Sequence, residues 1–265
     1  MSPILAEQVT MLMRSVAKEV VLPRFQKLAR EDIAEKSPGD LVTVVDHESE
    51  ERIAEGLAKL LPEARIVGEE DAAENPALLD SLDRDMVWLV DPLDGTTNFA
   101  EGKLPFAIMI ALIADGETQA GWILDPVTPR ICYAARSRGA YLNGERITSQ
   151  ASPHALPLAA LGLHFMSEER QRAFAARADE KLNIVPIPRC AGEQYPRVVL
   201  SVNDVALFAK SQPYDHAAGA LFLEEAGGKT AWPDGNGYRV TRRDPDLLAA
   251  ATPQLWDRAA EILFG

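Results

Sequence analysis

The chain has 265 residues, of which 47% are hydrophobic, and a formal charge of −13 at pH 7. That length is enough for a large single unit or for two closely packed layers of structure. Such an acidic surface repels phosphate backbones and anionic lipid, so we expect neither nucleic acid nor a membrane as partner. The two cysteines, Cys132 and Cys190, exclude a disulfide framework and favour a reducing compartment.

The first 60 residues carry two helical patterns with a turn between them. Apolar residues recur at helical spacing over residues 4–20 and predict an amphipathic helix that ends near Pro23. Charged residues interrupt this segment, so we expect neither a signal peptide nor a membrane span, and we expect a cytoplasmic protein. Residues 36–40 are typical of a turn, and a second helix is predicted from Thr43.

Short apolar runs then alternate with helical patterns in both halves of the chain. The first half predicts strands at residues 65–67, 86–90, 106–113, 121–124 and 131–135, with a hairpin turn at Asn143 and Gly144. The second half predicts a strand at 158–163, a helix at 167–181, an apolar segment at 198–207 and a helix at 216–226 that ends at Gly227. This mixture predicts a layered α/β or α+β fold with two halves, 1–150 and 151–265, that share an interface.

The most informative segment, residues 88–99, reads Trp-Leu-Val-Asp-Pro-Leu-Asp-Gly-Thr-Thr-Asn-Phe. An apolar strand would deliver Asp91 at its end, and the proline after it would turn the chain so that Asp94 converges on the same point. Gly95 would let the backbone approach a ligand, and the hydroxyl of Thr96 follows. Carboxylates, a carbonyl and a hydroxyl suit Mg²⁺. A solvated acidic turn is the simpler alternative.

Other acidic segments could join this site, although each also has a purely structural interpretation. Glu69 and Glu70 follow a short apolar run, but adjacent acidic residues are usually solvated surface. Asp215 precedes a predicted helix, where it would be the N-cap. Asp46 lies three residues after Thr43, which fits a capping box. Each segment is weak evidence alone, and their joint presence needs a common explanation.

Together, these segments resemble the signatures of the inositol monophosphatase superfamily. Its Gly-Glu-Glu, Asp-Pro-φ-Asp-Gly-Thr-Thr-Asn-Phe and Trp-Asp-x-Ala-Ala-Gly motifs occur in order at residues 68–70, 91–99 and 214–219, with Tyr214 replacing the tryptophan. The likeness extends from about residue 36 to 228. It implies an αβαβα sandwich of the inositol monophosphatase and fructose-1,6-bisphosphatase type, commonly homodimeric, with activity that lithium inhibits.

By that resemblance, the metal ligands would be Glu69, Asp91, the carbonyl of Leu93, Asp94 and Asp215. The first half would carry most of them, and Asp91 would bridge two metal positions. Two or three Mg²⁺ ions are implied, and Mn²⁺ could replace them. A metal-bound water has a lowered pKa and becomes a competent nucleophile, while a second ion stabilises the leaving alkoxide.

The resemblance also implies roles around the metals. Thr96, paired with Asp46, would help to activate the attacking water, and Glu70 would orient ligands or a further ion. The backbone amides of Gly95 and Thr96 would face the substrate phosphate. In-line displacement at phosphorus requires positioning and charge neutralisation more than covalent chemistry.

The substrate-reading part departs from the inositol-hydrolysing pattern. Residues 189–195 stand where those members carry a Gly-Ser/Thr-Ala stretch, and here we expect Ala191 and Glu193 to contact the substrate, with Tyr195 as a further polar contact. Phe208 occupies the position, seven residues before Asp215, where those members tend to have a glutamate for sugar hydroxyls.

The sequence therefore predicts Mg²⁺-dependent hydrolysis of a small anionic phosphate monoester, resembling inositol 1-phosphate or a sugar phosphate. It leaves open 3'(2'),5'-bisphosphate nucleotidase, fructose-1,6-bisphosphatase and histidinol-phosphatase activity, as well as a non-catalytic binding or regulatory role on the same fold. A P-loop is excluded because Leu223 stands where its first glycine belongs. A haloacid-dehalogenase-type site needs aspartates two residues apart, whereas Asp91 and Asp94 are three apart.

Overall fold

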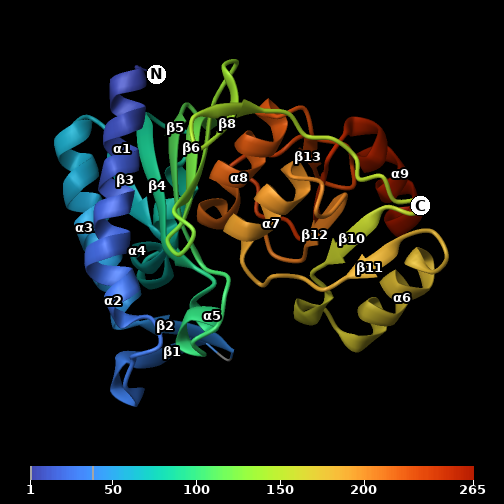
Figure 1. Ribbon diagram of the computed structural model, residues 1–265, viewed down its shortest axis with the longest axis horizontal. Helices are drawn as coiled ribbons and strands as arrows, with labels where there is room; N and C mark the ends of the chain where they lie inside the picture. The colour runs from blue at the N-terminus through green and yellow to red at the C-terminus, as the bar shows by residue number, and fades with distance from the viewer. Residues whose placement is uncertain (1, 38) are drawn as a thin grey trace.

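Helices and two large sheets form five successive layers in the computed structural model, which describes residues 2–37 and 39–265 (Figure 1). Helices cover the outer face of each sheet, and a further pair of helices lies between the sheets. The three helical layers are α1 (Pro3–Val16) with α3 (Val44–Leu60), α7 (Ala191–Val199) with α8 (Pro213–Glu225), and α6 (Glu168–Ala178) with α9 (Pro253–Phe264). The predicted αβαβα sandwich is confirmed.

The larger sheet has seven strands in chain order, the first pair parallel and the other pairs antiparallel. Since helices cover both of its faces, its strands read as apolar runs. Val87 and Leu89 belong to the core on the α8 side, and Trp88 and Val90 to the core on the α1 side. The strands are β3 (Arg65–Gly68), β4 (Met86–Asp94), β5 (Ala107–Ala114), β6 (Glu117–Asp125), β7 (Arg130–Ala135), β8 (Gly139–Leu142) and β9 (Glu145–Ile147).

The smaller sheet has five strands in the order β11-β10-β12-β14-β13. Its strands are β10 (Leu158–Leu161), β11 (Asn183–Val185), β12 (Val205–Phe208), β13 (Lys229–Ala231) and β14 (Leu247–Ala250). The remaining elements are short: β1 (Ile33–Ser37) and β2 (Asp40–Thr43), which pair as a hairpin, α2 (Leu22–Arg24), α4 (Glu69–Glu74), α5 (Thr96–Ala100), the π-helical turn Ala17–Val21 and the 3₁₀ turns Arg30–Asp32, Pro76–Ser81 and Leu163–Phe165.

Small residues allow α8 to lie directly against the larger sheet. A Cβ atom on Gly121 of β6 would come within 2.6 Å of the Cα atom of Ala218, and one on Gly219 would come within 2.0 Å of the Tyr195 ring on α7. Larger side chains at these positions would push α8 away from both neighbours. The Ala-Ala-Gly part of the late motif therefore fixes the place of α8, and with it the place of Asp215.

Most predicted elements are confirmed, with boundaries shifted by a few residues. The first helix continues through the π-helical turn to Arg24, and Thr43 caps α3 in the predicted capping box with Asp46. Asn143 and Gly144 have positive φ values of 51° and 86° in the turn between β8 and β9. Thr43 therefore marks the helix start, and the Asn-Gly pair marks the hairpin, as their residue types predict.

Three predictions need correction. Strand β4 does not end at Asp91: it continues through Pro92 to Asp94, with a bulge between the two aspartates that leaves the proline without a partner in the ladder. Helix α8 begins at Pro213, with Gln212 as the N-cap, so Asp215 is the third helical residue and not the cap. The apolar segment 198–207 contains both the end of α7, a helix the sequence pattern did not predict, and the start of β12.

The strands of the larger sheet all precede residue 150, and those of the smaller sheet all follow it. Helices α7 and α8 of the second half nevertheless pack against strands of the first, and one apolar core joins both. The division into 1–150 and 151–265 stays a prediction. Within the described residues, we find no helix that is both long and apolar enough to span a bilayer.

Candidate active site

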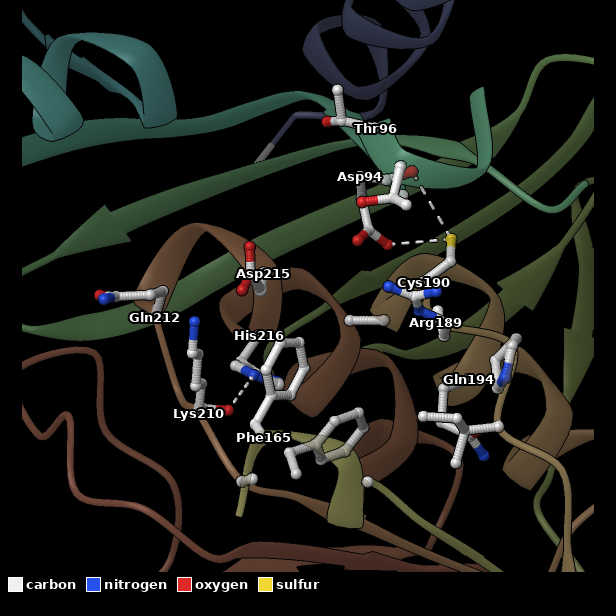
Figure 2. Close-up of a pocket in the computed structure, with 18 of the residues that line it drawn as sticks. Asp94, Thr96, Phe165, Arg189, Cys190, Gln194, Lys210, Gln212, Asp215 and His216 are labelled. Atoms are coloured by element: carbon white, nitrogen blue, oxygen red, sulfur yellow. Dashed lines mark hydrogen bonds between the residues drawn. The ribbon is translucent and has the colours of Figure 1, made fainter. Parts of the chain in front are cut away.

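A pocket of about 540 Å³ opens where the ends of β3 and β4 face the N-terminal ends of α7 and α8 (Figure 2). The first half of the chain supplies acidic residues to its wall, and the second half supplies Asp215 together with basic, amide and aromatic residues. Of the predicted site residues, Glu69, Asp91, Leu93, Asp94, Gly95, Thr96, Ala191 and Asp215 line this pocket.

Three carboxylates from distant parts of the sequence converge in the pocket. Glu69, Asp91 and Asp215 each offer one oxygen, and these oxygens lie within 4.8 Å of one another. Glu69 begins α4 directly after β3, Asp91 lies on β4, and Asp215 lies in the first turn of α8. The parallel pairing of β3 with β4 brings the first two together, and the packing of α8 brings the third.

Asp91 is the most buried residue of this cluster and is only 1% exposed. Its Oδ1 accepts a hydrogen bond of 3.0 Å from the amide of Leu93, whereas its buried Oδ2 receives none from the described residues. Burial raises the pKa of Asp91 well above its usual range, and the negative charges of Glu69, Asp94 and Asp215 raise it further. A buried carboxylate oxygen with no donor, on a residue that clusters with two further carboxylates, fits a cation ligand.

Lys36 extends from β1 to the edge of the acidic cluster. Its Nζ lies 3.0 Å from Glu69 Oε1 and 2.7 Å from Glu70 Oε1. Burial opposes the charge of Lys36, but the two carboxylates outweigh it and raise its pKa. Burial and the nearby Glu69 raise the pKa of Glu70 to about 8. A lysine ammonium thus partly neutralises this side of the cluster.

Thr96 and Asp46 form the hydrogen-bonded pair that the family resemblance implies. The Thr96 hydroxyl lies 2.9 Å from both Asp46 Oδ1 and the carbonyl of Leu93, and its single proton can be donated to either. The other oxygen of Asp46 accepts from the Thr43 hydroxyl at 2.6 Å and the Thr43 amide at 2.9 Å. Burial raises the pKa of Asp46 to about 6, although these hydrogen bonds oppose the shift.

Asp94 uses one carboxylate oxygen to join the two halves of the chain. Its Oδ2 accepts the amide of Gly192 at 2.5 Å and the thiol of Cys190 at 3.0 Å, so it lies at the start of α7 (Figure 2). Burial raises its pKa to about 6, against the effect of these donors. Asp94 is not part of the three-carboxylate cluster, and any metal contact of this residue stays a prediction.

The glycine after Asp94 is required by geometry. Gly95 has a φ of 87°, and a Cβ atom there would come within 3.0 Å of the Pro105 carbonyl oxygen and 3.3 Å of the Cys190 Cβ. A larger residue would strain the turn that carries Thr96 and would disturb the contact with α7.

The expected substrate contacts on α7 are only partly placed in the pocket. Ala191 lines it, but Glu193 does not, because its carboxylate pairs with Arg130 and Arg197. Tyr195 is fully buried, and its hydroxyl bonds to His216. Glu193 and Tyr195 thus do not line the pocket, and a substrate contact by either residue stays a prediction.

The sequence interpretation missed several residues of the pocket wall opposite the carboxylates. Arg189, Lys210, Gln194 and Phe165 all line the pocket (Figure 2). They lie in loops or in a helix without a known motif, so residue spacing could not reveal them. The clearest available signal was the occurrence of Arg189 and Gln194 within the stretch that departs from the inositol-hydrolysing pattern.

A buried histidine holds this opposite wall in place. His216 Nε2 lies 3.0 Å from the carbonyl of Lys210, which can only accept, so Nε2 carries the proton and Nδ1 accepts from the Tyr195 hydroxyl at 2.9 Å. Burial lowers the pKa of His216 to about 4, which keeps the ring neutral. Phe208 stacks on Tyr195, with ring centroids 5.0 Å apart, and forms an apolar part of the wall.

The chain is similar to known proteins over nearly its whole length. The model of the inositol monophosphatase family matches residues 4–263, nearly the whole chain. The chain belongs to the inositol monophosphatase family. It is 31% identical over 215 residues, 79% of each chain, to a fructose-1,6-bisphosphatase/inositol-1-monophosphatase of Aquifex aeolicus. It is 29% identical over 248 residues, 88% of each chain, to Nus factor SuhB of Escherichia coli K12.

Solved structures extend the likeness of fold to the complete chain. The suhB protein of Bartonella henselae aligns with a TM-score of 0.85 at 23% identity and covers 98% of both chains. A Staphylococcal IMPase-I complexed with products aligns with the same TM-score at 18% identity, covering 100% of this chain and 96% of that one. Membership of this family implies a phosphatase fold. Phosphatase activity in the family generally depends on Mg²⁺.

Proposed function

We propose that this chain hydrolyses a small phosphate monoester with the help of Mg²⁺. The observation that carries the proposal is the convergence of Glu69, Asp91 and Asp215, together with a buried Asp91 oxygen that has no hydrogen-bond donor among the described residues. Mg²⁺ takes oxygen ligands and usually keeps several waters. The all-oxygen composition of the cluster fits that requirement, and Leu93 lines the same pocket.

When bound, Mg²⁺ would supply an activated water and neutralise charge on the phosphoryl group. The protein's own residues position that water. Since Asp46 has a pKa of about 6, it is mostly ionised at pH 7 and can accept the proton of the Thr96 hydroxyl. The Thr96 oxygen is then free to accept a hydrogen bond from water and to fix its orientation.

The remaining assignments follow the family resemblance. Glu69, Asp91, the carbonyl of Leu93, Asp94 and Asp215 would hold two or three Mg²⁺ ions, and Glu70 would assist them. The backbone of Gly95 and Thr96, with Ala191 opposite, would contact the phosphate in the pocket that they line. Mn²⁺ as a substitute, inhibition by lithium and a homodimeric state extend the proposal, and activity assays and light scattering test them.

The similarity to Nus factor SuhB favours a second candidate, a regulatory role that needs no turnover. The two candidates differ in what they require of the acidic cluster. A regulatory protein could lose the geometry of Thr96 and Asp46, but here their hydrogen bond of 2.9 Å is present. Catalysis is therefore the better supported of the two.

The test is a phosphate-release screen over inositol, sugar, nucleotide and amino-alcohol phosphates. Chelation should abolish release from at least one ester, and added Mg²⁺ or Mn²⁺ should restore it. Full activity after exhaustive chelation would refute the metal mechanism, and the absence of release from every ester would favour the regulatory role.

A further inference from the structure

Glu50 is a buried carboxylate outside the set of proposed metal ligands. It lies on α3, four residues after Asp46, so the two side chains project from the same face of that helix, and it is only 7% exposed. Among the residues that the structure describes, no lysine, arginine or histidine nitrogen lies within 4.0 Å of its oxygens. A buried carboxylate without an ion pair is costly for a folded protein, so its other contacts must offset that cost.

Both oxygens of Glu50 contact the first turn of α4, the short helix that begins at Glu69. Oε2 accepts a hydrogen bond of 2.9 Å from the amide of Glu70, and Oε1 accepts one of 3.0 Å from the amide of Asp71. In many helices, the side chain of the N-cap residue accepts from these second and third amides. Here the N-cap is Gly68, which has no side chain, so Glu50 caps the helix from a neighbouring element.

The absence of a side chain at Gly68 leaves room for this cap. A Cβ atom there would lie 2.0 Å from Glu50 Cδ and within 2.3 Å of both carboxylate oxygens. Gly68 has a φ of −92° and a ψ of 164°, an extended conformation that any residue adopts, so the backbone itself does not require glycine. Glycine is required because the Glu50 carboxylate occupies the place of a side chain. The first residue of the Gly-Glu-Glu motif is thus explained by a contact with α3.

We propose that Glu50 is a positioning residue for the metal site: by holding the first turn of α4, it fixes Glu69 in the three-carboxylate cluster. This inference rests on the proposed function, in which Glu69 is a metal ligand. Since Asp46 on the same helix bonds to the Thr96 hydroxyl, α3 sets the positions of a metal ligand and of the water-positioning hydroxyl together.

Glu50→Gln tests the proposal directly. Glutamine keeps the size of the side chain but replaces one acceptor by an NH₂ group, which cannot accept from a backbone amide. Titration calorimetry of the metal-free full-length chain with Mg²⁺ alone should show binding at least about 10-fold weaker than in the wild type, because the loss of a partner that orients a ligand typically costs that factor. The Mg²⁺ concentration for half-maximal activity should rise by the same factor, while kcat at saturating Mg²⁺ changes little. Glu51→Gln, an exposed neighbour on α3, is the matched control and should alter neither quantity.

Gly68→Ala is an independent test that leaves every carboxylate in the chain. Its methyl group should displace the Glu50 carboxylate and weaken Mg²⁺ binding by a similar factor. The double variant should bind Mg²⁺ no more weakly than the weaker single variant, because both changes break the same two hydrogen bonds. Losses that multiply in the double variant would overturn the proposal. If Glu50→Gln does not fold, Gly68→Ala decides the matter alone.

The melting temperatures of the metal-free variants distinguish positioning from a purely structural role. A lower melting temperature with an unchanged affinity for Mg²⁺ would make Glu50 a structural cap of α4 and would contradict the proposal. Failure of the phosphatase function itself would look different, because the wild type would then bind no Mg²⁺ and release no phosphate in a Mg²⁺-dependent manner.

Discussion

The acidic and basic sides of the pocket are built in different ways. On the acidic side, Glu69 follows β3, Asp91 lies on the neighbouring strand β4, and the first turn of α8 adds Asp215. On the basic side, Arg189 and Lys210 lie in loops, and His216, which bonds to Tyr195, donates to the carbonyl of Lys210. The carboxylates are thus positioned by paired strands and a closely packed helix, whereas the two cations are positioned by loops.

The largest expected effect lies on the acidic side. Asp91→Asn keeps the shape of the side chain but removes a buried charge, so phosphate release should fall by at least about 10²-fold. The metal-free protein should keep or gain thermal stability, because like charges no longer repel. Asp179→Asn on the surface serves as control. A parallel loss of fold and activity in Asp91→Asn would give this residue a structural role instead.

Substitutions at Thr96 distinguish water positioning from metal binding. Thr96→Val removes the hydroxyl that bonds to Asp46, and kcat should fall by about 10²-fold with little change in the Mg²⁺ requirement. Thr96→Ser keeps the hydroxyl and should retain most of the activity. If the valine variant were as active as the serine variant, the pair would have no part in turnover.

At Asp215, the loss of charge can be tested separately from the loss of a helix cap. Because Gln212 is the N-cap of α8, Asp215→Asn leaves the cap intact and changes only a charge in the first turn. The Mg²⁺ concentration for half-maximal activity should rise at least about 10-fold, while the melting temperature of the metal-free protein barely moves. An unchanged half-saturation point would remove Asp215 from the cluster.

The acidic side should also make the metal-free protein sensitive to pH. Burial raises the pKa of Asp46 and Asp94 to about 6, Glu50 to about 7 and Glu70 to about 8, so the folded state binds more protons than the unfolded state above pH 4. Stability should therefore fall as the pH rises from 4 to 8, although His216, whose pKa burial lowers to about 4, opposes this below pH 6.5. Urea unfolding in chelator measures it, and stability that rises over this range would contradict the assignment.

The smallest effect is expected at Glu193, outside the pocket. Glu193→Gln weakens its ion pairs with Arg130 and Arg197 and should cost about 1 kcal/mol of stability. Since Glu193 does not line the pocket, KM should stay the same for every ester. A changed KM would restore Glu193 as a substrate contact.

The difference between the acidic and basic sides also explains which site residues the sequence could predict. The motif around Asp91 and the Ala-Ala-Gly stretch after Asp215 are tied to local geometry, namely a bulged strand end and a closely packed helix, so their spacing carries information. Helix α8 begins three residues before the predicted start, because Pro213 suits the first turn of a helix.

The basic side could not be predicted in the same way. Gln194 and Glu193 are adjacent on α7, and only the direction of the helix decides which one lines the pocket. Arg130, which draws Glu193 away, comes from β7 and is 63 residues distant in the chain. Contacts of that kind depend on tertiary packing and leave no local pattern.

The most direct test of the central claim is the affinity of the metal-free protein for Mg²⁺, measured by titration calorimetry on the wild type and on Asp91→Asn. The account predicts that the wild type binds Mg²⁺ and that the asparagine variant, correctly folded, binds it at least about 10-fold more weakly, because the variant lacks one charged ligand. Equal affinities, or no binding by the wild type, would contradict the assignment of the carboxylate cluster as the metal site.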